Sequence, residues 1–258
     1  MSTVDVPVKA WLEHDGALLR LRLARPKANL VDAAMIAALH GALVEFREHK
    51  GLRGVLLDAE GPHFSFGASV EEHLPAHCAQ MLASLHALLL AMLEFPAPIL
   101  VAVRGQCLGG GLELALAGGP IFAAPDAQFG QPEIRLGVIA PAASVLLPYR
   151  VSQPVAEDLL CSGRSMAATE AVACGLVQAL ADDPQAAAVA WFEQHLRGRS
   201  AAALACALTA ARGQMRGDVR RRLADVEQLY SERVMRTHDA NEGLSAFLEK
   251  RQPAWTHD

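Results

Sequence analysis

The chain has 258 residues, 52% of them hydrophobic, which is enough for one large core with a smaller helical unit attached. Its 23 Lys and Arg residues against 28 Asp and Glu residues give a net charge of −5, which offers no electrostatic reason to bind nucleic acid. Five cysteines without a Cys-x-x-Cys pair argue against a disulfide framework or a zinc site. No apolar stretch reaches the roughly 18–20 residues of a membrane span and no secretory signal is recognisable, so we expect a cytoplasmic protein.

The first hundred residues alternate predicted strands with predicted helices. Leucines at every second position of residues 17–23, with arginines between them, predict a half-buried strand. Asp32 is predicted to cap a helix whose apolar residues recur every three or four positions. Two short runs rich in branched residues, 54–59 and 99–103, predict strands buried on both faces, and a long helix over 79–94 separates them.

The remaining chain changes character near residue 150. A helix over 111–116 and a strand over 120–124 continue the strand-strand-helix order of an α/β domain. Beyond residue 150 the sequence is alanine-rich and shows no strand pattern. Helices are predicted there over residues 168–174, 183–196, 201–212 and 218–235. We therefore predict a catalytic core over residues 1–195 and a C-terminal helical region over 196–258.

Two glutamates twenty positions apart are the strongest candidates for chemistry. Glu113 ends the sequence Cys-Leu-Gly-Gly-Gly-Leu-Glu, and Glu133 ends Phe-Gly-Gln-Pro-Glu. Glycine lets a ligand approach the backbone and lets an N–H point at developing negative charge, so the pair suggests acid/base chemistry. The alternative is structural: Glu113 would complement the positive end of a helix, and Glu133 would pair with an arginine at the surface.

The two glycine-rich motifs, in this order and spacing, resemble those of the crotonase (enoyl-CoA hydratase/isomerase) superfamily. They are Gly-Gln-Cys-Leu-Gly-Gly-Gly-Leu-Glu-Leu-Ala at 105–115 and Ala-Gln-Phe-Gly-Gln-Pro-Glu at 127–133, and shorter matches lie at 25–29, 64–68 and 247–251. The resemblance thus spans nearly the whole chain. It implies a crotonase-like α/β fold, a spiral of repeated β-β-α units followed by a helical trimerisation region, and a homotrimer or a homohexamer built as a dimer of trimers.

The resemblance also assigns roles to residues. The backbone N–H groups of Ala68 and Gly110 would hold an acyl-CoA thioester oxygen and stabilise an enolate, and Glu113 and Glu133 match the two hydratase carboxylates that hold the attacking water. Neither a metal nor a cofactor is expected, because coenzyme A is part of the substrate. The expected coenzyme A contacts are Lys27, Ala28, Phe64, Phe66, Ala68 and Lys250.

Two departures from the usual hydratase motifs argue for an unusual acyl group. Ser69 stands where aspartate is common, and residues 139–148 lack the usual Gly-Gly-Thr-Gln-Arg-Leu run. Residues 64–73 and 140–144 are similar to family members that hydrate a cyclic 1,5-dienoyl-CoA in anaerobic benzoyl-CoA degradation. Small residues in the second segment leave room for a ring, although an ordinary helix N-terminus explains them equally well.

Other functions remain open at this stage. Retention of both glutamates favours a hydratase over isomerase, hydrolase or decarboxylase relatives. A hydratase for straight-chain or branched 2-enoyl-CoA is the first alternative, and a non-catalytic protein that binds CoA esters is the second. A dinucleotide-binding oxidoreductase is disfavoured because the glycines form one consecutive triplet. His73 and His77 resemble metal ligands but are better explained as residues of a loop that lines the pocket.

Overall fold

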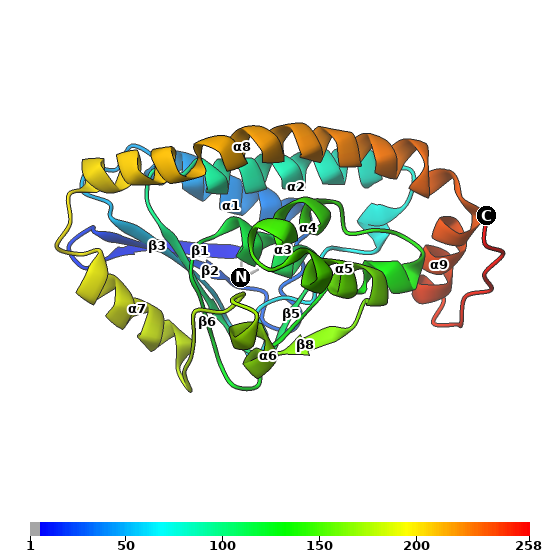
Figure 1. Ribbon diagram of the computed structural model, residues 1–258, viewed down its shortest axis with the longest axis horizontal. Coiled ribbons are helices and arrows are strands. Elements are labelled where there is room, and N and C mark those ends of the chain that lie inside the picture. The colour runs from blue at the N-terminus through cyan, green and yellow to red at the C-terminus, as the bar shows by residue number, and fades with distance from the viewer. Residues whose placement is uncertain (1–5) are drawn as a thin grey trace, which may run out of the picture.

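The computed structural model describes residues 6–258, which form a twisted sheet with helices on both faces (Figure 1). Within these residues the main sheet has six strands in the order β1-β2-β3-β4-β6-β9, parallel except for the β1–β2 pair. A smaller sheet, β5-β7-β8, lies beside it. The strands are β1 Val8–Glu13, β2 Leu18–Leu23, β3 Gly54–Ala59, β4 Ile99–Val103, β5 Gln106–Leu108, β6 Ile121–Ala123, β7 Gln128–Gly130, β8 Ser165–Ala167 and β9 Ala179–Leu180.

The helices form two unequal layers. Helices α1 and α2 pack together on one side of the sheet, α8 runs along α2 and α4, and α7 contacts β3, β4 and β6 (Figure 1). The helices are α1 Ala33–Phe46, α2 Cys78–Leu93, α3 Gly110–Ala117, α4 Pro141–Leu146, α5 Gln153–Ser162, α6 Ala168–Ala173, α7 Pro184–His195, α8 Ala201–Glu232 and α9 His238–Leu248. Short 3-10 turns are η1 Glu71–His73, η2 Pro132–Leu136, η3 Leu147–Tyr149 and η4 Val234–Arg236. The main core fills the space between the sheet and α1 to α4, and a smaller core lies under α7.

Predictions based on local pattern are confirmed in the first half of the chain. The predicted strands coincide with β2, β3, β4 and β6, and the helix predicted over 79–94 is α2. Asp32 caps α1, because its side chain accepts a hydrogen bond from the Met35 N–H at 2.8 Å. Helix α3 includes the predicted segment 111–116 and is buried along its whole length. These strands and helices are determined by residues within or next to them, such as the Asp32 cap, so the sequence prediction and the structure agree.

Two predictions for the second half are wrong. Strands do occur after residue 150: β8 pairs antiparallel with β7, and β9 extends the main sheet. Both are too short to show an alternating pattern. The separate helices predicted over 201–212 and 218–235 are one helix, α8, which continues through Gly213 and Gly217. Buried side chains on its far half, including Tyr230, anchor it, so tertiary packing outweighs the low helix propensity of glycine. The predicted domain division at residues 195 and 196 falls between α7 and α8 and stays a prediction.

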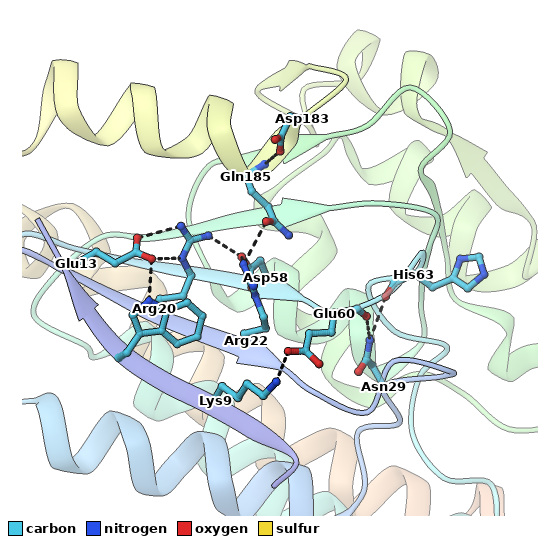
Figure 2. Close-up of polar contacts among 11 residues, drawn as sticks. Lys9, Glu13, Arg20, Arg22, Asn29, Asp58, Glu60, His63, Asp183 and Gln185 are labelled. Atoms are coloured by element: carbon cyan, nitrogen blue, oxygen red, sulfur yellow. Dashed lines mark hydrogen bonds and ion pairs between the residues drawn. The ribbon is translucent and has the colours of Figure 1, made fainter.

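The strand β2 is also more buried than its alternating pattern indicates. The face that carries Arg20 and Arg22 is covered, and Figure 2 shows the ion-pair network that satisfies it. Asp58 of β3 is fully buried and accepts from Arg20 Nη1 at 2.6 Å and from Arg22 Nε at 2.7 Å. Arg22 also donates to Gln185 in the first turn of α7 at 3.2 Å. The network therefore ties α7 to the sheet.

Replacing Asp58 with asparagine is expected to lower the free energy of unfolding by about 1.5–3 kcal/mol, because the buried Arg20 and the half-buried Arg22 lose a charged acceptor. Glu60→Gln is the matched control, since the Lys9–Glu60 pair is exposed and should contribute less than about 1 kcal/mol. Urea unfolding of both variants measures the difference. Equal losses in the two variants would contradict a special role for the buried network.

Candidate active site

The structure contains a cavity of about 600 Å³ at the end of the molecule where α9 lies. Its wall combines the loop before η1, the start of α3, the turn η2 and the end of α9. The residues that line it are Leu30, Phe66, Gly67, Ala68, Ser69, Val70, Glu71, His73, Gly109, Pro132, Glu133, Arg135, Leu136, Val138, Phe247 and Leu248. Most of these side chains are apolar, so the cavity suits an apolar group with few polar contacts.

Two backbone N–H groups lie together at one side of this cavity. Val31 donates to the Gly67 oxygen at 2.9 Å in a parallel bridge with Ala68, a pattern in which the Ala68 N–H points away from Val31. Gly110 is the first residue of α3, so its N–H has no acceptor within the helix. A Cβ built on Gly110 would lie 3.2 Å from the Ala68 nitrogen. Neither N–H has a hydrogen-bond acceptor within residues 6–258, so both remain available to a ligand.

The close approach of these loops depends on two glycines in the left-handed region. Gly67 has a φ of +107°, and a Cβ there would lie 3.1 Å from the Leu108 oxygen. Gly109 has a φ of +50°, and a Cβ there would lie 2.6 Å from Oε1 of Glu133. Side chains at either position would therefore force the loop that carries Ala68 away from α3 or displace the Glu133 carboxyl group.

Glu113 occupies the first turn of α3 and is only 4% exposed. Its Oε1 accepts a hydrogen bond from the Ala143 N–H at 2.8 Å, at the positive end of α4. Burial raises the pKa of Glu113 well above the ordinary carboxyl range, and the backbone N–H groups of Ala143 and Ala142 oppose that increase. The Glu113 carboxyl group therefore exchanges a proton near neutral pH.

Glu133 lies on η2 and lines the cavity. The side-chain amide of Gln131, which is almost fully buried, faces the Glu133 carboxyl group, and with its nitrogen assigned to that side it donates to the two oxygens at 3.2 and 3.0 Å. Burial raises the pKa of Glu133, and the charge of Glu113 raises it further. Because ionising both carboxyl groups at once is unfavourable, the pair holds one proton over a range of pH that includes neutrality. Glu133 is half-buried, and its carboxyl group forms no ion pair with an arginine within residues 6–258, which contradicts the alternative of a surface Glu–Arg pair.

The structure brings some predicted contact residues to the cavity and not others. Phe66 and Ala68 line the wall, and Phe66 donates from its N–H to the Ala28 oxygen at 2.9 Å. Lys27 and Lys250 are exposed outside the wall, although Lys250 follows the wall residues of α9. The side chain of Phe64 is 1% exposed and packs in the core.

The alanines predicted to leave room for a ring have another function. Ala140, Ala142 and Ala143 are buried and do not line the cavity; they form the ordinary N-terminus of α4, with Pro141 as its first residue. Their contribution is the backbone N–H that reaches Glu113. That their small side chains also leave space for the acyl group beside Glu113 stays a prediction.

Two residues that contact wall side chains were not found from the sequence. Gln131 lies within the Phe-Gly-Gln-Pro-Glu motif, where its position beside Glu133 is the available signal. Tyr230, on α8, is wholly buried and contacts His73, and nothing in the local sequence connects these two distant residues. His73 lines the cavity, as predicted for the loop that contains it, whereas His77 is exposed at the start of α2.

Comparison with known proteins identifies the family. Residues 13–258 match the model of the family described as enoyl-CoA hydratase/isomerase. The chain is 62% identical to a cyclohexa-1,5-dienecarbonyl-CoA hydratase from Thauera aromatica, over 99% of each chain, and 30% identical to a carnitinyl-CoA dehydratase from Proteus mirabilis, over 93% and 95% of the respective chains.

A solved structure of a putative enoyl-CoA hydratase from Mycobacterium avium paratuberculosis superposes with a TM-score of 0.87 at 27% identity, covering 96% of this chain and 99% of that one. The predicted crotonase-like fold is thereby confirmed. None of the helices within residues 6–258 is long and apolar enough to cross a membrane. The chain belongs to the enoyl-CoA hydratase/isomerase family.

Proposed function

We propose that the protein adds water to cyclohexa-1,5-diene-1-carbonyl-CoA and forms 6-hydroxycyclohex-1-ene-1-carbonyl-CoA, a step suited to anaerobic benzoyl-CoA degradation. The observation that carries this proposal is the 62% identity, over 99% of both chains, to a hydratase named for that dienoyl thioester. The site supports it, because Glu133 and Ala68 line one mostly apolar cavity, the charge of Glu113 acts on Glu133, and Gly110 lies beside the Ala68 nitrogen.

In the proposed mechanism, Glu113 acts as the base and Glu133 as the acid. The two backbone N–H groups that approach Glu113 favour its ionised form, whereas the charge of Glu113 favours the protonated form of Glu133. Glu113 takes a proton from water as the hydroxyl oxygen bonds to ring carbon C2. The electron pair of the C1=C2 bond moves onto the thioester oxygen, which Ala68 and Gly110 bind through their N–H groups.

The enolate is conjugated with the second ring double bond, so its negative charge extends to C5. Glu133 gives its proton to C5, a double bond forms between C1 and C6, and the thioester carbonyl is restored. Renumbering the ring gives the 6-hydroxy product. Coenzyme A takes part as a portion of the substrate, and the route needs only carboxyl groups and backbone amides.

Turnover of the dienoyl thioester and of crotonyl-CoA tests the proposal. We expect a higher kcat/KM for the dienoyl substrate and, in heavy water, one deuterium at C5. Preference for crotonyl-CoA would replace the proposal with a general 2-enoyl-CoA hydratase, and binding of both thioesters without turnover would favour a non-catalytic protein. Deuterium absent from C5 would contradict the 1,4-addition.

We also propose that the chain forms a homotrimer or a dimer of trimers, and that Lys27, Ala28, Phe66 and Lys250 contact coenzyme A. Support for assembly comes from family membership and from exposed apolar side chains on α9, of which Phe247 is 54% exposed. Analytical ultracentrifugation measures the assembly state. Lys27→Ala and Lys250→Ala should raise KM and leave kcat nearly unchanged, because they remove binding at a distance from the reacting atoms.

The pH dependence of kcat/KM is expected to be bell-shaped, with its maximum well above the ordinary carboxyl pKa of about 4. Activity needs Glu113 ionised and Glu133 protonated, and burial raises both pKa values. The rate should therefore fall on the acid side as Glu113 gains a proton, and on the alkaline side as Glu133 loses one. A profile in which kcat/KM falls on only one side of the maximum would contradict two glutamates that share one proton.

A further inference from the structure

The cavity wall contains a buried histidine that the proposed mechanism does not use. His73 ends η1, is 8% exposed and lines the cavity beside apolar residues such as Val70 and Val138. Two other polar side chains of the wall, Glu71 and Arg135, are exposed. A buried imidazole among apolar groups is costly unless its nitrogens find partners, so its surroundings define what it can do.

Tyr230 of α8 supplies the partner for one ring nitrogen. Its hydroxyl lies 3.1 Å from Nδ1 of His73, and its side chain is wholly buried behind the cavity. Burial lowers the pKa of His73 to about 4, so the imidazole is neutral near pH 7. Burial also raises the pKa of Tyr230, so the phenol keeps its proton.

These contacts determine the tautomer of His73. The Tyr230 hydroxyl has no other hydrogen-bond partner within residues 6–258, so it donates to Nδ1 and leaves the ring proton on Nε2. The buried side-chain nitrogen and oxygen atoms without partners in that range are Arg53 Nε, Glu72 Oε2 and His86 Nε2. Nε2 of His73 also lacks a protein partner, yet it is not one of these buried atoms. It is therefore exposed, and because His73 lines the cavity, we take this atom to face it. The wall thus presents a fixed, uncharged N–H donor.

We propose that His73, held by Tyr230, is an acyl-group specificity residue whose Nε2–H stabilises the negative charge that spreads onto the far edge of a cyclic dienoyl group in the enolate. This inference rests on the proposed hydration of the dienoyl thioester. In that enolate the charge reaches C5, across the ring from the carbon that receives the hydroxyl group. In the enolate of a straight-chain enoyl thioester the charge is confined to the thioester oxygen and the α-carbon, so an N–H at a distant wall gives no advantage.

The test compares kcat and KM of variants on two substrates, the dienoyl thioester and crotonyl-CoA. His73→Leu should lower kcat on the dienoyl substrate at least about tenfold, and on crotonyl-CoA less than about twofold, because the donor acts on charge present only in the first enolate. His73→Gln should restore most of the dienoyl rate, since its amide N–H extends to a similar position. Tyr230→Phe should lower the dienoyl rate in the wild-type background and have no effect in the His73→Gln background.

Several outcomes would overturn the inference. Equal losses on both substrates would indicate a structural role, and losses that add in the Tyr230→Phe, His73→Gln double variant would show that the two side chains act separately. If His73→Leu fails to fold, Tyr230→Phe and His73→Gln decide the question. A wild type that turns over crotonyl-CoA alone refutes the proposed function and this inference together. A wild type active on the dienoyl thioester, with an unchanged substrate ratio in the variants, refutes the inference alone.

Discussion

Replacing Glu133 with glutamine is expected to lower kcat about 10²–10⁴-fold with little change in KM, because the amide cannot donate an acidic proton to the enolate. Glu113→Gln should have an effect of similar size, since the amide retains an acceptor for the Ala143 N–H but cannot take a proton from water. Steady-state kinetics on the dienoyl thioester measures both losses. Because the two carboxyl groups act as one unit, the double variant should be little worse than either single variant.

The pH profiles of the two variants distinguish their roles. Residual activity of Glu113→Gln should lack the acid limb, and that of Glu133→Gln should lack the alkaline limb. The reverse pattern would exchange the assigned base and acid, whereas retention of both limbs in each variant would contradict the participation of either glutamate. A third variant, Glu170→Gln, is a suitable control, because Glu170 on α6 forms an exposed ion pair with Arg164 and its replacement should leave kcat unchanged.

The stability of the Glu133→Gln variant provides a check on folding. Glu133 has a raised pKa in the folded state, so the folded chain holds the proton more tightly than the unfolded chain does. Stability of the wild type therefore falls as pH rises from the ordinary carboxyl pKa through the folded one. Glutamine removes that dependence, so the variant should be at least as stable as the wild type at alkaline pH. A variant that loses both activity and stability would leave the catalytic assignment without support.

The features that the sequence predicted correctly are those determined locally. The glycines near Glu113 and Glu133 indicated close backbone approach, and a Cβ built on Gly109 would lie only 2.6 Å from Oε1 of Glu133. Asp32 likewise caps α1 because an N-cap needs only its own helix. Strand and helix types followed from periodicity wherever an element was long enough to show one.

The features that were missed depend on contacts between distant segments. The partner of His73 comes from α8, and a hydrogen-bond acceptor for Arg22 comes from α7, neither of which a local pattern can reveal. The strand β9 exists because its backbone pairs with β6, with Gln178 donating to the Ile121 oxygen at 2.8 Å, although its two residues carry no periodic signal. The glycine-rich motifs located the glutamates and the resemblance to a family gave them roles, whereas the positions of the alanines of α4 required the structure.

Substituting proline for Ala68 is expected to lower kcat about 10²–10³-fold, because it deletes one of the two N–H groups that we propose bind the reacting thioester oxygen. The substitution removes no hydrogen bond of the folded chain, since this N–H has no acceptor within residues 6–258, and the preceding Gly67 tolerates unusual backbone angles. Ala68→Gly is the matched control: it keeps the N–H and removes only a methyl group, so kcat should remain within about threefold of wild type if the donor, and not the side chain, stabilises the enolate. Both variants should be measured for kcat, KM and thermal unfolding. A proline variant that is folded and nearly as active as the wild type would show that the thioester oxygen is held elsewhere, whereas equal losses in the proline and glycine variants would attribute the effect to altered packing of the loop.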